Sequence, residues 1–406
     1  MPNRKITHPE TFEDVYKRLE EVMLANSGEN EFEEIFKLVI LKLWQDLINS
    51  DCIIDNVSDA NKCLSKIDQM WKNVLVKTEL NITEEQFLVC KNIISPFNFV
   101  QGGFEGIDAI FEFLISKEKK GAKGQFFTPR YIVDFCVKIL NPKNGETVLD
   151  PACGSGAFLY HSYLNGLNDG KLLWGFDYDN TVIRICRLLM YVEGVSGFQI
   201  HKVNSLIKKT SQLFLQGGTF AEASTTIEDI LRIEKFKGPF DVIITNPPFA
   251  GEIVEPEILS NYEVAFGKTR IERDILFIER CINLLKANGR MAIVLPDNIF
   301  GGKETETLRK WIYGQCRIIG VVGVPRNAFM PHTSVKTSIL FLQKREHKRN
   351  ISENVFFAIG EKPGKDSRGT VLYKHCNTNS WKDVDHDFDE IALQFRSFIL
   401  QERIGW

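Results

Sequence analysis

The residues with the clearest chemical pattern are Asn246, Pro247, Pro248 and Phe249, which follow the apolar run FDVIIT. Two consecutive prolines fix φ and remove two backbone N–H donors, so the carbonyl groups around them are left to accept hydrogen bonds. The side-chain oxygen of Asn246 and the carbonyl of Pro247 could together bind both hydrogens of an –NH2 group. Phe249 offers a ring face for stacking. Alone, NPPF would also suit an ordinary turn; in context it predicts a site for a planar amine.

A glycine-containing turn, DPACGSG, occupies residues 150–156, between an apolar run and a helical pattern. Its two glycines let the backbone turn sharply and approach a ligand closely. A GxG turn alone is a weak signal, since many strand-to-helix turns carry one. The absence of a third glycine and of a GK[ST] sequence argues against a dinucleotide fingerprint and a P-loop.

An acidic residue, Asp177, ends the next apolar run within the sequence GFDYD. A carboxylate at this strand end is placed to accept hydrogen bonds from both hydroxyls of a ribose. The alternative is that Asp177 caps the helix expected to begin near Asn180. The glycine turn and this acid make the turn-only interpretation of NPPF the less favoured one.

Short apolar runs and helical patterns must position these residues. The runs lie at 147–150, 172–177, 240–246 and 290–296, and the helical patterns at 130–140, 156–167, 180–193 and 272–286. This alternation is typical of βαβ units and a buried, largely parallel sheet. Two later runs, 318–325 and 336–344, have no helix-length spacer between them and predict an antiparallel hairpin added to the sheet.

A basic, glycine-containing hinge, KEKKGAKG at 117–124, separates this region from an acidic N-terminal part with helical patterns near 12–23, 31–48, 84–94 and 106–115. We therefore expect three parts: a helical N-terminal domain (1–120), an α/β domain (121–345) and a C-terminal tail (346–406). The amphipathic stretch Phe388 to Leu400 in the tail is expected to serve subunit assembly. The chain of 406 residues is long enough for more than one domain.

Composition excludes several classes of protein. The chain is 44% hydrophobic and 25% charged, which is ordinary for a globular protein and rules out general disorder. Nine cysteines without a CxxC pair argue against a disulfide framework and a cysteine zinc site. We expect no membrane association and a cytoplasmic location. With a net charge of −3, a nucleic-acid partner would have to be bound by local basic stretches, at 117–130, 268–273 and 344–349. Each stretch could equally be a solvated surface.

Taken together, DPACGSG, GFDYD and NPPF make the chain similar to adenine-N6 DNA methyltransferases that use S-adenosylmethionine. More closely, it resembles the modification (M) subunit of type I restriction-modification systems, through GQFFTPR (124–130), GRMAIVLPDNIF (289–300), LRKW (308–311) and SVKTSILFLQK (334–344). The resemblance covers roughly residues 105–345. It implies a Rossmann-like methyltransferase sheet with an antiparallel hairpin edge, preceded by an all-α N-terminal domain.

The resemblance also implies roles for individual residues. Those that match cofactor-binding positions are Phe126, Thr128, Pro129, Asp150, Ala152, Gly154, Ser155, Gly156, Asp177, Tyr178, Asn204 and Asn246. Those that match the catalytic motif are Asn246, Pro247, Pro248 and Phe249, and Phe249 and Phe329 match the aromatic residues that contact a flipped adenine. Asn204 departs from the pattern, since many relatives have Asp there, but its side-chain oxygen can still accept a hydrogen bond. The resemblance further implies S-adenosylmethionine as the cofactor and no requirement for a metal.

The implied activity is methylation of adenine N6 in double-stranded DNA, with base flipping. The implied partners are a specificity subunit, a second copy of the M subunit and, in some systems, a restriction subunit. About 60 residues follow Lys344, too few to read several base pairs, so specificity is expected in another polypeptide. Two alternatives stay open: a methyltransferase for the glutamine side-chain amide of translation release factors, and a catalytically inactive interaction subunit.

Overall fold

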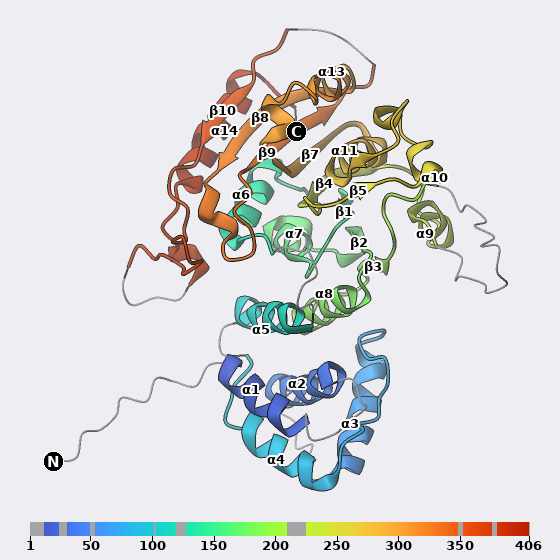
Figure 1. Ribbon diagram of the computed structural model, residues 1–406, viewed down its shortest axis with the longest axis vertical. Coiled ribbons are helices and arrows are strands. Elements are labelled where there is room, and N and C mark those ends of the chain that lie inside the picture. Colours follow the sequence, from blue (N-terminus) through green and yellow to red (C-terminus); the bar gives the residue numbers. More distant parts are fainter. Residues whose placement is uncertain are drawn as a thin grey trace. The chain divides into compact units, whose positions relative to one another are not determined.

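The computed structural model describes residues 12–23, 31–48, 53–100, 103–118, 127–208, 225–347, 352–375 and 380–405. Two compact units are present (Figure 1). The first contains Met1–Gly121 and Arg184–Gly194, and the second contains Ala122–Ile183 and Val195–Trp406. Within the described residues, no helix is long and apolar enough to cross a membrane.

The first unit is helical. Its helices are α1 (Phe12–Met23), α2 (Glu31–Ile48), α3 (Val57–Met70), α4 (Glu84–Ile94) and α5 (Gly103–Glu118). Side chains fix two helix starts: Asn56 accepts a hydrogen bond from the Asp59 amide at α3, and Thr83 forms a capping box with Gln86 at α4. The apolar faces meet in a core that includes an edge-to-face pair of Trp44 and Trp71 at 5.0 Å.

An eight-stranded sheet forms the second unit, in the order β10-β8-β9-β7-β4-β1-β2-β3. The strands are β1 (Val148–Asp150), β2 (Leu173–Asp177), β3 (Gln199–Lys202), β4 (Phe240–Thr245), β7 (Leu285–Pro296), β8 (Cys316–Val324), β9 (Thr337–Lys344) and β10 (Phe356–Ile359). Strands β3, β2, β1, β4 and β7 are mutually parallel, whereas β9 is antiparallel to both β7 and β8. The predicted parallel sheet and its antiparallel hairpin are therefore confirmed.

Helices cover both faces of this sheet (Figure 1). The helices of the second unit are α6 (Arg130–Leu140), α7 (Ala157–Ser162), α9 (Ile227–Ile233), α10 (Pro256–Leu259), α11 (Arg273–Leu284), α12 (Asn298–Gly301), α13 (Glu306–Gln315) and α14 (Phe388–Gln401). Helix α8 (Asn180–Val192) begins after β2, and its residues from Arg184 onward belong to the first unit. Alternate residues of β9 pack on opposite faces. Leu340 and Leu342 belong to the core formed with α11 and α13, while Phe341 contacts Phe135 of α6 and Phe395 of α14.

Residues 346–406, expected to form a tail, contribute to this unit. Strand β10 pairs in parallel with β8, and α14 packs against α6. Phe395 is fully buried, and a Cβ atom added at Gly320 would lie 2.5 Å from its ring, so only glycine allows this approach. Helix α14 still leaves Leu393 and Leu400 exposed. Deleting the segment would therefore remove part of the core as well as any surface for assembly.

Candidate functional site

The candidate residues lie at the carboxyl ends of three neighbouring parallel strands. The glycine turn follows β1, Asp177 ends β2, and Asn246 follows β4. Parallel strands place these ends at one edge of the sheet, where α/β proteins commonly bind ligands. The fold thus brings together motifs that are nearly 100 residues apart in the chain.

The glycine turn and Asp177 are in direct contact. Gly154 and Gly156 have positive φ angles of 52° and 89°, a conformation that L side chains rarely adopt. The Gly154 amide donates to a carboxylate oxygen of Asp177 at 3.2 Å, and the Asp179 amide donates to the other at 3.0 Å. Asp179, rather than Asp177, accepts from the Val182 amide at the start of α8. The helix-capping interpretation of Asp177 is therefore wrong.

Asp150 is a buried carboxyl group beneath this turn. It is 1% exposed, and its Oδ1 accepts a hydrogen bond from the Ala152 amide at 3.0 Å. Burial, with a contribution from the charge of Asp177, raises the pKa of Asp150 to about 7. Ser155, in the same turn, is also buried. These contacts hold the turn in one conformation.

The Asn246 side chain has one satisfied and one unsatisfied end. Its Nδ2 donates to Oγ1 of Thr128, just before α6, at 2.9 Å. Its Oδ1 is buried and has no hydrogen-bond partner in the described part of the chain. A buried acceptor without a partner is unfavourable by about 1–3 kcal/mol, so such atoms commonly mark functional sites. Pro129 precedes α6 and its carbonyl accepts from the Ile132 and Val133 amides. Phe126 lies outside the described residues.

Phe249 and Phe329 are also brought together. Their ring centroids are 6.2 Å apart and their planes meet at 88°, an edge-to-face pair. Phe329 is 1% exposed, whereas Phe249 is half-buried and lines a pocket of about 270 Å³. In this arrangement the two rings touch each other and do not form parallel walls around a gap. The pocket is lined by Phe249, Glu272, Asp274, Pro296, Asp297, Asn298, Val335 and Lys336.

This pocket is rich in acidic groups. Asp274 is 1% exposed, and burial, together with the charge of Glu272, raises its pKa to about 6. Asp297 accepts from the Ser338 hydroxyl at 2.7 Å and pairs with Lys336 at 3.2 Å. Three acidic side chains, Glu272, Asp274 and Asp297, thus lie in the pocket lined by Phe249. None of them was a candidate in the sequence analysis.

Tyr178 and Asn204 lie near the same edge of the sheet. Tyr178 follows Asp177 and its side chain is exposed. Asn204 follows β3, and its Oδ1 accepts from the Leu206 amide at 3.1 Å, so this oxygen already has a local partner. Ser205 donates through its hydroxyl to the Pro151 carbonyl at 2.6 Å. The Asn204–Ser205 loop is therefore tied to the glycine turn.

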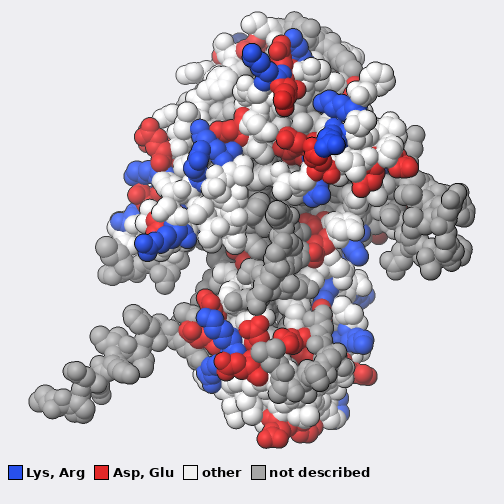
Figure 2. All heavy atoms as spheres, viewed as in Figure 1, with Lys and Arg blue, Asp and Glu red and all other residues white. Residues whose placement is uncertain are grey.

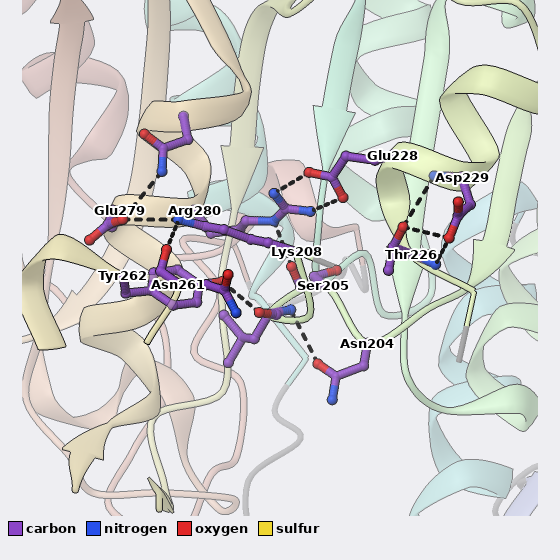
Figure 3. Close-up of polar contacts among 12 residues, drawn as sticks. Asn204, Ser205, Lys208, Thr226, Glu228, Asp229, Asn261, Tyr262, Glu279 and Arg280 are labelled. Carbon is purple, nitrogen blue, oxygen red and sulfur yellow. Dashed lines mark hydrogen bonds and ion pairs between the residues drawn. The ribbon is translucent and has the colours of Figure 1, made fainter. Parts of the chain in front are cut away.

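A buried ion-pair network, which the sequence analysis missed, supports that loop (Figure 3). Arg280 of α11 is 2% exposed; its Nε donates to the Ser205 carbonyl at 2.7 Å, and its other nitrogens bind both carboxylate oxygens of Glu228 at 2.6 and 2.9 Å. Lys208 binds Glu279 at 2.9 Å and lies 3.8 Å from the ring centroid of Tyr262. The available signal was a charged residue within the apolar stripe of α11.

The described ranges contain no group of three or more His, Cys, Asp or Glu side chains placed to hold a metal ion. The seven described cysteines are free and buried.

Comparison with known proteins places these features in a family. The chain is 30% identical to the methylase subunit of the type I restriction enzyme EcoEI of Escherichia coli over 257 residues, which cover 60% of this chain and 47% of that protein. It is 26% identical to the methylase subunit of the type I restriction enzyme MpnII of Mycoplasma pneumoniae over 383 residues, covering 89% of this chain and 65% of that protein. The chain thus spans about half to two thirds of the length of these relatives.

A solved structure shares the fold. The type I restriction-modification system methyltransferase subunit from Streptococcus thermophilus superposes with a TM-score of 0.64 and 16% identity, covering 96% of this chain and 94% of that one. The family model for N-6 DNA Methylase matches residues 105–392, which include the glycine turn, Asp177 and the NPPF motif. The chain therefore belongs to the N-6 DNA methylase family.

Proposed function

We propose that this chain transfers a methyl group from S-adenosylmethionine to N6 of a flipped adenine in double-stranded DNA, as the modification subunit of a type I restriction-modification enzyme. The observation that carries the proposal is the buried, unpartnered Oδ1 of Asn246 after β4. An acceptor held in this way suits a substrate that brings an N–H donor, and adenine N6 carries two.

The residues at the strand ends fit S-adenosylmethionine, which supplies a methyl group on a sulfonium centre. The positive φ angles of Gly154 and Gly156 expose backbone close to a ligand, and Asp177 lies beside them with its carboxylate held by the Gly154 amide. In this proposal Asp177 binds the ribose hydroxyls, and Asn204 and Tyr178 contact the adenine of the cofactor. The remaining cofactor contacts are assigned to Phe126, Pro129, Asp150, Ala152 and Ser155, whereas Thr128 and Asn246, which are hydrogen-bonded to each other, are assigned to the methyl acceptor.

The difficult step in this reaction is to make the methyl acceptor, adenine N6, nucleophilic. The lone pair of adenine N6 is delocalised into the ring, so N6 is a poor nucleophile. Hydrogen bonds from N6 to Oδ1 of Asn246 and to the Pro247 carbonyl favour a more tetrahedral nitrogen with an available lone pair. Phe249 stacks on the flipped base, and Phe329, which packs edge to face with Phe249 in this structure, contacts the base from the other side. Orientation of the two reactants supplies much of the remaining rate enhancement.

The family membership favours DNA over the side-chain amide of a release factor, although both acceptors carry a planar –NH2 group. The intact glycine turn, Asp177 and Asn246 favour an active enzyme over an inactive interaction subunit. Double-stranded DNA, a specificity subunit and a second M subunit are the proposed partners, with a restriction subunit in a complete system. This assignment is supported by the relatives, which are methylase subunits of type I restriction enzymes.

Charge on the second unit supports local rather than broad contacts with DNA. Figure 2 shows Lys and Arg side chains interspersed with Asp and Glu over the visible face. Of the basic stretch at 344–349, Lys344 donates to the Leu285 carbonyl at 2.6 Å and Arg345 pairs with Glu353. Those two side chains are therefore engaged within the protein. We expect the isolated chain to bind DNA weakly and without sequence preference.

The test is methylation of a mixed-sequence plasmid by the chain alone and with its specificity subunit, read by single-molecule sequencing. We expect N6-methyladenine in one sequence motif only when the specificity subunit is present. Asn246→Ala should abolish methyl transfer and leave the calorimetric affinity for S-adenosylmethionine nearly unchanged, because Asn246 contacts the acceptor. Motif-specific methylation by the chain alone would contradict the partnership. Substantial activity of the variant, or methylation of a release factor instead of DNA, would contradict the catalytic assignment.

A further inference from the structure

The segment between NPPF and α11 forms an excursion that begins and ends beside the candidate site. Strands β5 (Glu252–Ile253) and β6 (Ile271–Glu272) pair antiparallel, with Glu252 opposite Glu272. Strand β5 begins three residues after Phe249, and Phe249 and Glu272 line the same pocket. Both ends of the excursion at 254–270 are therefore fixed beside the aromatic wall of that pocket.

The base of the excursion is packed into the core. Leu259, Tyr262 and Ala265 are buried, and the Tyr262 hydroxyl donates to the Leu206 carbonyl at 2.8 Å. Glu279 of α11 accepts a hydrogen bond from the Val264 amide at 2.9 Å. The same carboxylate binds Lys208 (Figure 3). The chain is thus held in place up to the residue before Phe266.

The tip of the excursion, Phe266 to Arg270, is exposed at every residue. Phe266 is 92% exposed, the highest fraction among the exposed large apolar side chains of the described residues. Lys268 and Arg270 give the tip two positive charges, and no residue from 266 to 270 is acidic. Arg270 reaches Glu252 only at 3.5 Å, an exposed ion pair worth little.

An exposed aromatic ring followed closely in the chain by two cations matches the chemistry of nucleic acid. Every base presents a π face for stacking, and phosphates flank each base step. Flipping an adenine leaves a gap in the base stack, and an apolar side chain that enters the stack offsets part of the loss. Such an insertion requires a protein segment whose root is held rigidly in the core and whose tip is exposed, as in the excursion at 254–270.

We propose that Phe266 stacks on the DNA bases beside the flipped adenine, with Lys268 and Arg270 contacting the flanking phosphates. This inference rests on the proposed function and adds a DNA-contacting element to it. The specificity subunit, which could instead cover an exposed phenylalanine, is the competing partner for the same tip.

The test compares two duplexes in fluorescence anisotropy at low salt, one intact and one with an abasic site. The abasic site provides the gap without base flipping, so the wild-type chain should bind that duplex more tightly. Phe266→Ala should weaken binding to the abasic duplex by roughly 5- to 150-fold, the fold-change that corresponds to the loss of stacking on one base. Phe266→Trp should keep the preference. Lys268→Ala should weaken both duplexes alike and lower the salt dependence by about one phosphate contact.

Phe357→Ala is the matched control, because Phe357 is exposed on β10 and distant in sequence from the tip. Its binding to both duplexes should equal that of the wild type. If Phe266→Ala bound both duplexes like the wild type, the inference would be overturned; the same result with loss of specificity-subunit binding would assign the tip to that subunit. Plasmid methylation by the wild-type complex is measured separately, so a failure of the proposed function is distinguishable.

Discussion

Replacing Thr128 with valine tests how the side chain of Asn246 is oriented. An asparagine amide has two orientations related by a half turn, and only one presents oxygen to the substrate amine. In the structure, the Thr128 hydroxyl accepts from Nδ2 of Asn246 at 2.9 Å, which leaves Oδ1 as the acceptor. Valine has nearly the shape of threonine but cannot accept this hydrogen bond. Thr128→Val should therefore slow methyl transfer.

The expected size follows from the hydrogen bond that is lost. A buried donor left without a partner is unfavourable by about 1–3 kcal/mol. If this energy is lost only from the reactive orientation of Asn246, the rate falls by roughly 5- to 150-fold. The affinity for S-adenosylmethionine should change little, because Thr128 acts on the side chain of Asn246, which contacts the adenine amine and not the cofactor.

Single-turnover methylation and calorimetric titration with S-adenosylmethionine separate the two roles of Thr128. Thr128→Ser keeps the hydroxyl and should retain most of the wild-type rate, which a merely structural effect of the substitution would not explain. An unchanged rate for Thr128→Val would refute the reasoning. A rate loss that saturating cofactor restores would return Thr128 to the cofactor-binding role implied by the sequence resemblance.

Two further predictions concern the cofactor and stability. Asp177→Ala should weaken S-adenosylmethionine binding by roughly 10- to 100-fold, through loss of hydrogen bonds to a charged group; unchanged calorimetric affinity would remove Asp177 from the ribose site. Burial lowers the pKa of His161 to about 3. Below about pH 6.5 the unfolded chain therefore takes up a proton that the folded chain does not. As the pH falls further, this proton uptake lowers the free energy of unfolding by about 1.4 kcal/mol per pH unit. His161→Phe should remove that component in urea unfolding at pH 7 and pH 5, and an equal loss in both proteins would contradict it.

The sequence predicted the elements whose signals are local. Strands β1, β2, β4 and β7 are buried apolar runs between amphipathic helices, and the structure places them where those runs lie. Helix α3 was missed, although its buried side chains, Ala60, Cys63, Leu64 and Ile67, have the i, i+3, i+4, i+7 spacing of an amphipathic helix. Strand β3 has only one fully buried residue, Ile200, and depends on pairing with β2. Pairing between distant segments also explains β10, which the sequence analysis left in a tail.

The sequence predicted the motifs of the candidate site but not the distant residues that hold those motifs in place. The NPPF motif, the glycine turn and Asp177 have distinctive local sequences, whereas the partners that orient them are distant. Thr128 lies 118 residues from Asn246 in the chain, and no local spacing indicates that their side chains meet. The same holds for Phe266, whose exposure depends on how the base of its excursion packs.

Arg280 shows why residues that hold the motifs in place cannot be assigned from the sequence, and how their contacts depend on the folded structure. Its guanidinium joins α11 to Glu228, 52 residues earlier, and to the backbone of Ser205, 75 residues earlier. A buried charge without a partner would be strongly unfavourable, so the arrangement is stable only when all three elements are in place. Because Ser205 in turn donates to the Pro151 carbonyl, the network makes the position of the glycine turn depend on α11. Helix α11 begins directly after β6, which closes the excursion carrying Phe266. A single helix therefore supports both the proposed cofactor site and the proposed DNA contact.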